Sequence, residues 1–278
     1  MFIACQFLPQ GGKMRKIGAA HTRALYNTSP YMAEFHKLMD QQCYAYHYAD
    51  VYRDFLSLSI CALLSDHTKD HPREKAYMEI VEKYRGDKAQ MRRFADMFGC
   101  VAMHIHKTGR ECLSELWEVY ASNDNLGQFF TPWSVCQLLN RITDGAREIP
   151  ESGNIIVSDP SCGGGRMFIA SALDLKPYQR ARVFYHGIDI DYFCCVIAAL
   201  NLCFFNLNGW IVHGDALSLK GHRVFECRHT VCGGMIREWT DADKVEKIIT
   251  MGLPVESEIT ARKQPLSGKQ CEQLCFNF

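Results

Sequence analysis

The sequence of 278 residues contains no apolar run near the length of about 20 residues that a membrane-spanning helix needs. It also lacks an excess of charge, since 31 lysines and arginines balance 31 aspartates and glutamates. This balance excludes a strongly basic protein that coats nucleic acid by bulk electrostatics, but it allows a local basic patch. The basic residues of Lys13–Lys16 follow the apolar start of the chain rather than precede it, so we expect no signal peptide.

The composition of a small disulfide scaffold is absent too, because 14 cysteines are scattered over the whole chain. Several of them, such as Cys194 and Cys195, stand inside apolar runs, where a free cysteine behaves as a small hydrophobic residue. We therefore expect a reducing, cytoplasmic environment. The spacing of His222, Cys227 and the following His229 and Cys232 matches no common zinc site, so no metal is expected. An apolar content of 47% is enough for a real core.

Glycine is scarce between Gly18 and Gly127, and this part of the chain shows no alternation of period two. We predict a helical N-terminal region over residues 1–122, followed by a second domain over residues 123–278. Apolar spacing and a proline at a helix start predict four helices in the first region. They are expected over Asp50–Leu64, from Pro72 onward, over Lys88–His106 and over Glu111–Tyr120.

The second region changes in character, because short β-branched or apolar runs alternate with helical stretches. This alternation is typical of a parallel α/β sheet. Strands are expected at Asn154–Ser158, Ala181–Ile190, Trp210–His213 and Val224–Cys227, and helices at Met167–Leu175, Tyr192–Phe205 and Asp243–Thr250.

Acidic residues stand at the ends of the first three expected strands. Asp159 is followed by Gly163–Gly165, whose flexible backbone allows a sharp turn and the close approach of a ligand. Asp189 and Asp215 end the next two runs, where a carboxylate can accept hydrogen bonds from ribose hydroxyls or from an adenine amine. Any one of these acids alone is more simply a turn or cap residue. All three in order indicate an adenosine pocket.

The charge of Asp159 indicates which kind of cofactor the pocket would bind. A dinucleotide fingerprint G-x-G-x-x-G is lacking, since Phe168 stands three residues after Gly165. The carboxylate of Asp159 would repel a pyrophosphate, whereas it can hold the ammonium group of a methionine. The sequence therefore favours S-adenosylmethionine.

Three segments together resemble the adenine-N6 DNA methyltransferases. They are Gly127-Gln128-Phe129-Phe130-Thr131-Pro132, Asp159-Pro160-Ser161-Cys162-Gly163-Gly164-Gly165 and Gly187-Ile188-Asp189-Ile190-Asp191. The resemblance is greatest to the modification subunits of type I restriction systems and to methylase-like proteins of plasmids and conjugative elements. It implies an α/β, Rossmann-like S-adenosylmethionine-dependent methyltransferase sheet, DNA as substrate, and a specificity or other methyltransferase subunit as partner.

The same resemblance implies the cofactor contacts. It assigns Thr131 to the methionine carboxylate, Phe130 to packing beside the cofactor, Asp159 with Gly163, Gly164 and Gly165 to the methionine part, Asp189 to the ribose, Ile190 to an adenine face and Asp215 to the adenine amine. Gln128 and Cys162 complete the set, with Cys162 as a small packing residue rather than a nucleophile.

One motif of this family, Asn/Asp-Pro-Pro-Tyr/Phe, does not occur in the sequence. The prolines that follow Asp215, Pro254 and Pro265, stand in Leu-Pro-Val and Gln-Pro-Leu, so no catalytic residue can be assigned. The 63 residues after Asp215 are few for four more strand–helix pairs of about 20–30 residues each, so a short, divergent C-terminal part is expected. The alternatives are a cofactor- or DNA-binding accessory protein without transfer chemistry, and a methyltransferase that acts on RNA or protein.

Overall fold

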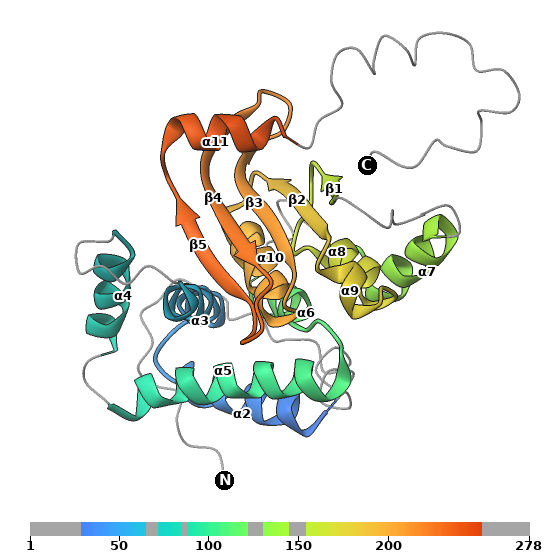
Figure 1. Cartoon of the computed structure of the whole chain (residues 1–278). Helices are drawn as coiled ribbons and strands as arrows, with labels where there is room; N and C mark the ends of the chain where they lie inside the picture. Colours follow the sequence, from blue (N-terminus) through green and yellow to red (C-terminus); the bar gives the residue numbers. More distant parts are fainter. Residues whose placement is uncertain (1–28, 65–71, 85–87, 122–129, 145–153, 252–278) are drawn as a thin grey trace, which may run out of the picture.

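The structure, a computed structural model, describes residues 29–64, 72–84, 88–121, 130–144 and 154–251 (Figure 1). Helices come first along the chain, and a sheet with helices on both faces follows. The first helices are α2 (Pro30–Gln42), α3 (Tyr48–Leu63), α4 (Pro72–Lys83), α5 (Lys88–Thr108), α6 (Leu113–Tyr120) and α7 (Trp133–Asp144). The sheet and its helices are β1 (Ile155–Asp159), α8 (Arg166–Leu173), α9 (Pro177–Arg180), β2 (Val183–Asp189), α10 (Tyr192–Phe204), β3 (Asn208–Asp215), β4 (Lys220–Arg228), β5 (Met235–Trp239) and α11 (Ala242–Ile249). No helix in these ranges is long and apolar enough to cross a membrane.

The five strands form one mixed sheet in the order β1-β2-β3-β4-β5. β1, β2 and β3 run parallel, as the alternation of strands and helices predicts. β4 and β5 are added antiparallel to β3. The expected strand at Val224–Cys227 is confirmed within β4, and the helix at Asp243–Thr250 is confirmed as α11. The antiparallel direction of β4 and the strand β5 were not foreseen.

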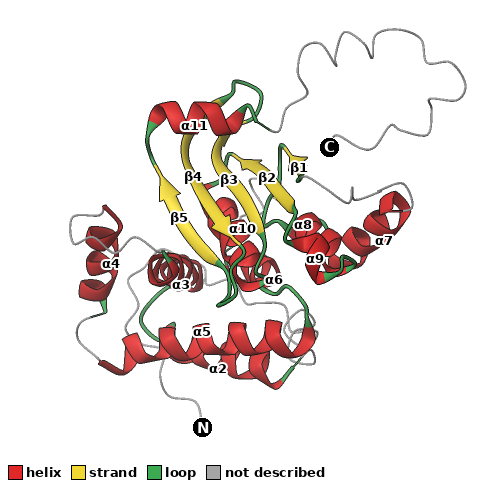
Figure 2. Ribbon diagram, viewed as in Figure 1, coloured by secondary structure: helices red, strands yellow, loops and turns green. Residues whose placement is uncertain are grey.

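The two faces of the sheet are covered unequally (Figure 2). α10 lies against one face, and ten of its side chains are buried, which fits a helix that is apolar all round. Its start is fixed by Asp191, whose carboxylate accepts hydrogen bonds from two backbone N–H groups of the first turn. α11 crosses the other face, where Val245 and Ile249 pack with Ile188, Val212 and Val224.

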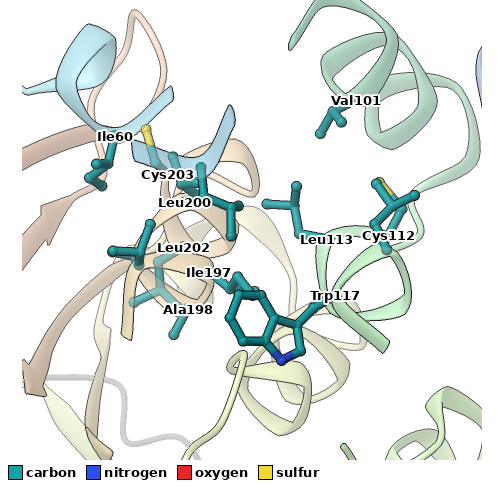
Figure 3. Packing of buried hydrophobic residues seen from close by; sticks show 14 of the residues in the cluster. Ile60, Val101, Cys112, Leu113, Trp117, Ile197, Ala198, Leu200, Leu202 and Cys203 are labelled. Atoms are coloured by element: carbon teal, nitrogen blue, oxygen red, sulfur yellow. The ribbon is translucent and has the colours of Figure 1, made fainter. Parts of the chain in front are cut away.

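A continuous core joins the N-terminal helices to the sheet. In Figure 3 Leu113 and Trp117 of α6 point toward Ile197 and Leu200 of α10, and all four side chains are buried. Burial of each such side chain stabilises the fold by about 1.5–3 kcal/mol. The boundary at residue 122 stays a prediction, but packing crosses it. The helical part therefore supports the sheet directly rather than through a linker.

Candidate cofactor site

The turn after β1 depends on its glycines. Gly163 and Gly165 have φ angles of 51° and 75°, in the left-handed region that favours glycine. A Cβ atom on Gly163 would lie 3.0 Å from the ring of Phe130, and one on Gly164 would lie 2.2 Å from Oγ of Ser114. The backbone is thus packed closely from both sides, and larger residues would displace the turn.

Asp159 and Asp189 lie together beside this turn, as the sequence predicts. The Oδ2 atom of Asp189 accepts a hydrogen bond of 2.8 Å from the Gly163 N–H, which ties the end of β2 to the glycine turn. Its Oδ1 atom accepts one of 2.9 Å from the Asp191 N–H. Asp159 accepts one of 2.9 Å from the Ser161 N–H. These bonds fix the direction of both carboxylates at adjacent strand ends.

The two carboxylates make this strand edge electronegative. Burial is the main cause that raises the pKa of Asp159 above its ordinary value, and the charge of Asp189 raises it further. Burial likewise raises the pKa of Asp189, and the charge of Asp191 adds to this effect. Ionisation of both groups at neutral pH therefore costs free energy in the protein alone. A ligand with a positive charge and hydroxyl donors would relieve that cost.

The segment before α7 reaches the same turn. The ring of Phe130 packs against Gly163, and its centroid lies 5.8 Å from the guanidinium carbon of Arg166. The carbonyl oxygen of Thr131 accepts a hydrogen bond of 3.1 Å from Nη1 of Arg166. Phe130 and Thr131 are therefore placed at the glycine turn. Gln128 lies outside the described residues.

Cys162 is a packed thiol. Its side chain is buried, and burial raises the pKa of its thiol well above the ordinary value. A Cβ atom on Gly187 would lie 2.7 Å from its sulfur, so strand β2 and the turn fit together through this pair. A neutral, enclosed thiol is a poor nucleophile, which is consistent with a packing role.

Ile190 and Asp215 occupy the outer part of the strand edge. Ile190 is 75% exposed directly after Asp189, so an apolar surface is open for contact with a ligand. Asp215 accepts hydrogen bonds from the Leu217 N–H at 2.9 Å and the Ser218 hydroxyl at 2.8 Å, and these lower its pKa. Its predicted contact with an adenine amine stays a prediction.

A buried polar network that the sequence analysis missed holds the turn from below. Glu111, just before α6, has a side chain with no exposed area, and it accepts a hydrogen bond of 2.9 Å from Nε of Arg166. It also accepts one of 3.1 Å from Nδ2 of Asn201, which donates a second one of 2.8 Å to the carbonyl of Gly164. An arginine directly after the glycines and an asparagine inside the apolar α10 were the available signals.

Two residues of the zinc-like pattern form hydrogen bonds within the fold. The Cys227 thiol donates to the Ala199 carbonyl inside the core, and His229 forms a hydrogen bond with the Asn206 carbonyl. Within the described ranges, no group of three metal-ligating side chains comes together.

Comparison with known proteins shows what this part of the chain is similar to. A model of the N-6 DNA methylase family matches residues 113–249, which run from α6 to the end of α11. The methylase subunit of the type I restriction enzyme MpnII of Mycoplasma pneumoniae is 28% identical over 110 residues. This match covers 38% of the present chain and 20% of that subunit, so the chain spans about a fifth of the length of the curated relative.

The matched segment contains the glycine turn, both carboxylates, and Arg166 and Asn201 of the network that supports them, whereas Glu111 lies just before it. It also contains the whole five-stranded sheet, which is the Rossmann-like methyltransferase fold that the motifs imply. Residues 113–249, just under half of the chain, are thus similar to the N-6 DNA methylase family.

Proposed function

We propose that the chain binds S-adenosylmethionine at the ends of β1 and β2 and transfers its methyl group to adenine N6 in DNA. The observation that supports this most is the pair of half-buried carboxylates, Asp159 and Asp189, beside a left-handed glycine turn in a segment similar to the N-6 DNA methylase family. An electronegative, glycine-lined strand end suits a nucleoside that carries a sulfonium and an ammonium group.

The residues fit such a cofactor by their chemistry. Asp159 would pair with the ammonium of the methionine part, and Asp189 would accept hydrogen bonds from the ribose hydroxyls, since each carboxylate oxygen can accept more than one. The exposed Ile190 would lie against the adenine. When bound, the cofactor supplies an electrophilic methyl group. The part of the chain is to orient it and to hold the target amine in line.

Calorimetry with S-adenosylmethionine and S-adenosylhomocysteine tests the cofactor. Loss of a charged acceptor costs about 1.5–3 kcal/mol, so we expect Asp189→Ala to weaken binding by about tenfold or more. Asp243→Ala, which removes an exposed carboxylate from the first turn of α11, is the matched control and should leave the affinity unchanged. No heat from either ligand with the wild-type chain would contradict the cofactor assignment, and unchanged affinity of D189A would contradict the ribose contact.

Transfer to DNA needs its own assay. A tritiated-methyl assay on adenine-rich duplex DNA, with and without specificity or other methyltransferase subunits, measures it directly. Methyl transfer to an adenine requires a base out of the stack and oxygen acceptors for its amine. We expect labelled N6-methyladenine, and label on cytosine or no label under any condition would exclude this activity. Such partner subunits, and a cytoplasmic location, are part of the proposal.

A second candidate function is a cofactor- or DNA-binding accessory protein without transfer chemistry. The absence of Asn/Asp-Pro-Pro-Tyr/Phe from the sequence favours it. Calorimetric binding together with no methyl transfer, even with partner subunits present, would select this function over the enzyme.

A further inference from the structure

A second polar site lies on the α10 side of the sheet. It is a cavity of about 540 Å³ between helices α3 and α4 and strands β3, β4 and β5. The side chains that matter for its chemistry are Arg73 of α4, Tyr192 at the start of α10, His213 of β3, Arg223 of β4 and Glu238 of β5. The function proposed above uses none of them.

The inner wall of this cavity has more positive than negative charge. Glu238 accepts hydrogen bonds from Nε and Nη2 of Arg73 at 2.6 and 2.7 Å and from Nη1 of Arg223 at 2.9 Å. Two guanidinium groups therefore share one nearly buried carboxylate. The other acid of the lining, Glu79, has a side chain that is 68% exposed at the rim, and Lys75 lies 4.0 Å from it. Solvent and this lysine screen its charge.

Two buried nitrogen atoms of the lining residues have no hydrogen-bond partner among the described residues. They are Nε of Arg223 and Nδ1 of His213. Buried donors are nearly always paired in folded proteins, so the unpaired N–H beside this cavity leaves the Arg223 guanidinium with hydrogen-bonding capacity that Glu238 does not use. The side chain of Arg223 keeps 30% of its area exposed, which leaves it within reach of a ligand.

Aromatic rings complete the site. The ring of Tyr192 is close to both arginines, with its centroid 5.3 Å from the guanidinium carbon of Arg73 and 5.0 Å from that of Arg223. The rings of His213 and His222 are 5.2 Å apart. After burial, the charges of Arg223 and His222 are the main causes that lower the pKa of His213, as expected in a positive field.

The cavity lies beside the strand edge that carries the candidate cofactor site. His213 is the register partner of Asp189 in the parallel pair β2–β3, and Tyr192 follows that aspartate by three residues. A ligand in the cavity would therefore sit next to the ends of the same strands.

We propose that this cavity binds a phosphate group, with Arg223 as its main donor. The planar guanidinium fork matches phosphate oxygens, and hydrogen bonds between charged partners are the stronger ones. A volume of about 540 Å³ exceeds a phosphate ion, so there is space for an attached sugar and base beside Tyr192. The phosphate belongs either to a free nucleotide or to a nucleic-acid strand. The site does not depend on cofactor binding or methyl transfer.

The test uses the full chain without cofactor. Inorganic phosphate and dAMP are titrated by calorimetry, and fluorescein-labelled single-stranded and duplex DNA by anisotropy at several salt concentrations. We expect Arg223→Gln to weaken binding at least fivefold and to reduce the slope of log affinity against log salt by about 0.7–0.9, the value for one lost phosphate contact. The matched control is Arg237→Gln, because Arg237 is exposed and stacks on Trp239, outside the cavity lining. Arg223→Lys keeps the charge and should restore part of the affinity.

The titrations with small ligands and with DNA distinguish a free nucleotide from a nucleic-acid strand. Weaker binding of phosphate and dAMP alone in R223Q supports a free nucleotide, and weaker DNA binding that phosphate competes away in the wild type supports a strand. No binding of any probe by the wild type, or equal losses in R223Q and R237Q, overturns the proposal. Thermal unfolding of each variant, with wild-type-like transitions required, separates a lost contact from a lost fold. Failure of S-adenosylmethionine to bind would undo the proposed function and leave this result intact.

Discussion

Two arginines, the buried Arg166 and the half-buried Arg73, join the N-terminal helical part to the sheet, and their surroundings have opposite charge. Arg166 lies below the glycine turn among Glu111, Glu115 and Glu118, so acids outnumber it. On the other side, Arg73 shares Glu238 with Arg223, so the bases are in excess. The chain has no net charge, yet it separates charge between two neighbouring sites. The acidic side, around Arg166 and the glycine turn, suits a cationic cofactor. The basic side, around Arg73 and Arg223, suits a phosphate.

The largest expected effect on stability comes from removing a carboxylate from the acidic side. Glu111→Ala leaves Arg166, which is 5% exposed, without its nearest carboxylate, and it also removes an acceptor from Asn201. Removal of one partner from a buried ion pair costs about 3–5 kcal/mol. We expect a loss of that size in the free energy of unfolding, measured by urea denaturation.

An exposed pair provides the control for this measurement. Glu34 contacts Lys37 at 3.2 Å with a side chain that is 49% exposed. Exposed pairs contribute about 0–1 kcal/mol, so Glu34→Ala should change stability little. If both variants lost the same amount, the network around Glu111 would not be the support that its burial indicates.

The matching change on the basic side should have a smaller effect. Arg73→Met removes two hydrogen bonds from Glu238, but Arg223 still donates to that carboxylate. We expect a loss of about 1.5–3 kcal/mol, the range for hydrogen bonds to charged groups. Lys75→Met, on the same helix with a side chain that is 85% exposed, is the control. A loss as large as that of Glu111→Ala would show that the second guanidinium does not compensate.

The glycine turn offers a third comparison within one chain. Gly163 and Gly109 both have left-handed φ angles, of 51° and 65°. Alanine at either position costs about 1–2 kcal/mol for the backbone alone. At Gly163 the added Cβ atom also meets the Phe130 ring at 3.0 Å, whereas nothing lies within 4 Å at Gly109. We expect Gly163→Ala to lose more stability than Gly109→Ala, and to weaken S-adenosylmethionine binding in calorimetry while Gly109→Ala does not. Equal effects would mean that the turn adapts to the methyl group.

Local patterns in the sequence were enough to predict much of the parallel half. A β-branched run that ends in an acid, followed by glycines and an apolar helix, predicts β1, the turn and α8. The same reasoning places Asp159 and Asp189 at adjacent strand ends, where the structure has them. These features depend on residues close together in the chain, so periodicity and turn chemistry specify them.

The rest of the fold and the cavity depend on contacts between residues that are far apart in the sequence. β5 is only five residues long, Met235–Trp239, and it forms by pairing with β4 rather than by its own pattern. The link between Arg73 and Glu238 spans 165 positions in the sequence. A surface helix with an arginine and a strand with a glutamate look ordinary alone, so no spacing rule could predict that they would meet in a cavity.

The smallest expected change in stability has the opposite sign and concerns the acidic side again. In the folded chain burial and Asp189 raise the pKa of Asp159 above its ordinary value of 3.8, so the folded state binds the proton more tightly than the unfolded state. The stability that this carboxyl contributes is therefore complete below pH 3.8 and is lost as the pH rises through the folded-state pKa. Asp159→Asn keeps an oxygen that can accept from the Ser161 N–H and has no charge to bury. We expect this variant to be slightly more stable than the wild type at pH 7, with no gain at pH 3.5, in urea titrations across that range.

The same variant should bind S-adenosylmethionine more weakly, because a binding site often trades stability for ligand affinity. Two outcomes would contradict the expected gain in stability: a stability difference that does not vary with pH, or one that favours the wild type at pH 7. Either would show that ionised Asp159 does not destabilise the folded chain, and would remove the electrostatic reason for a cationic ligand there.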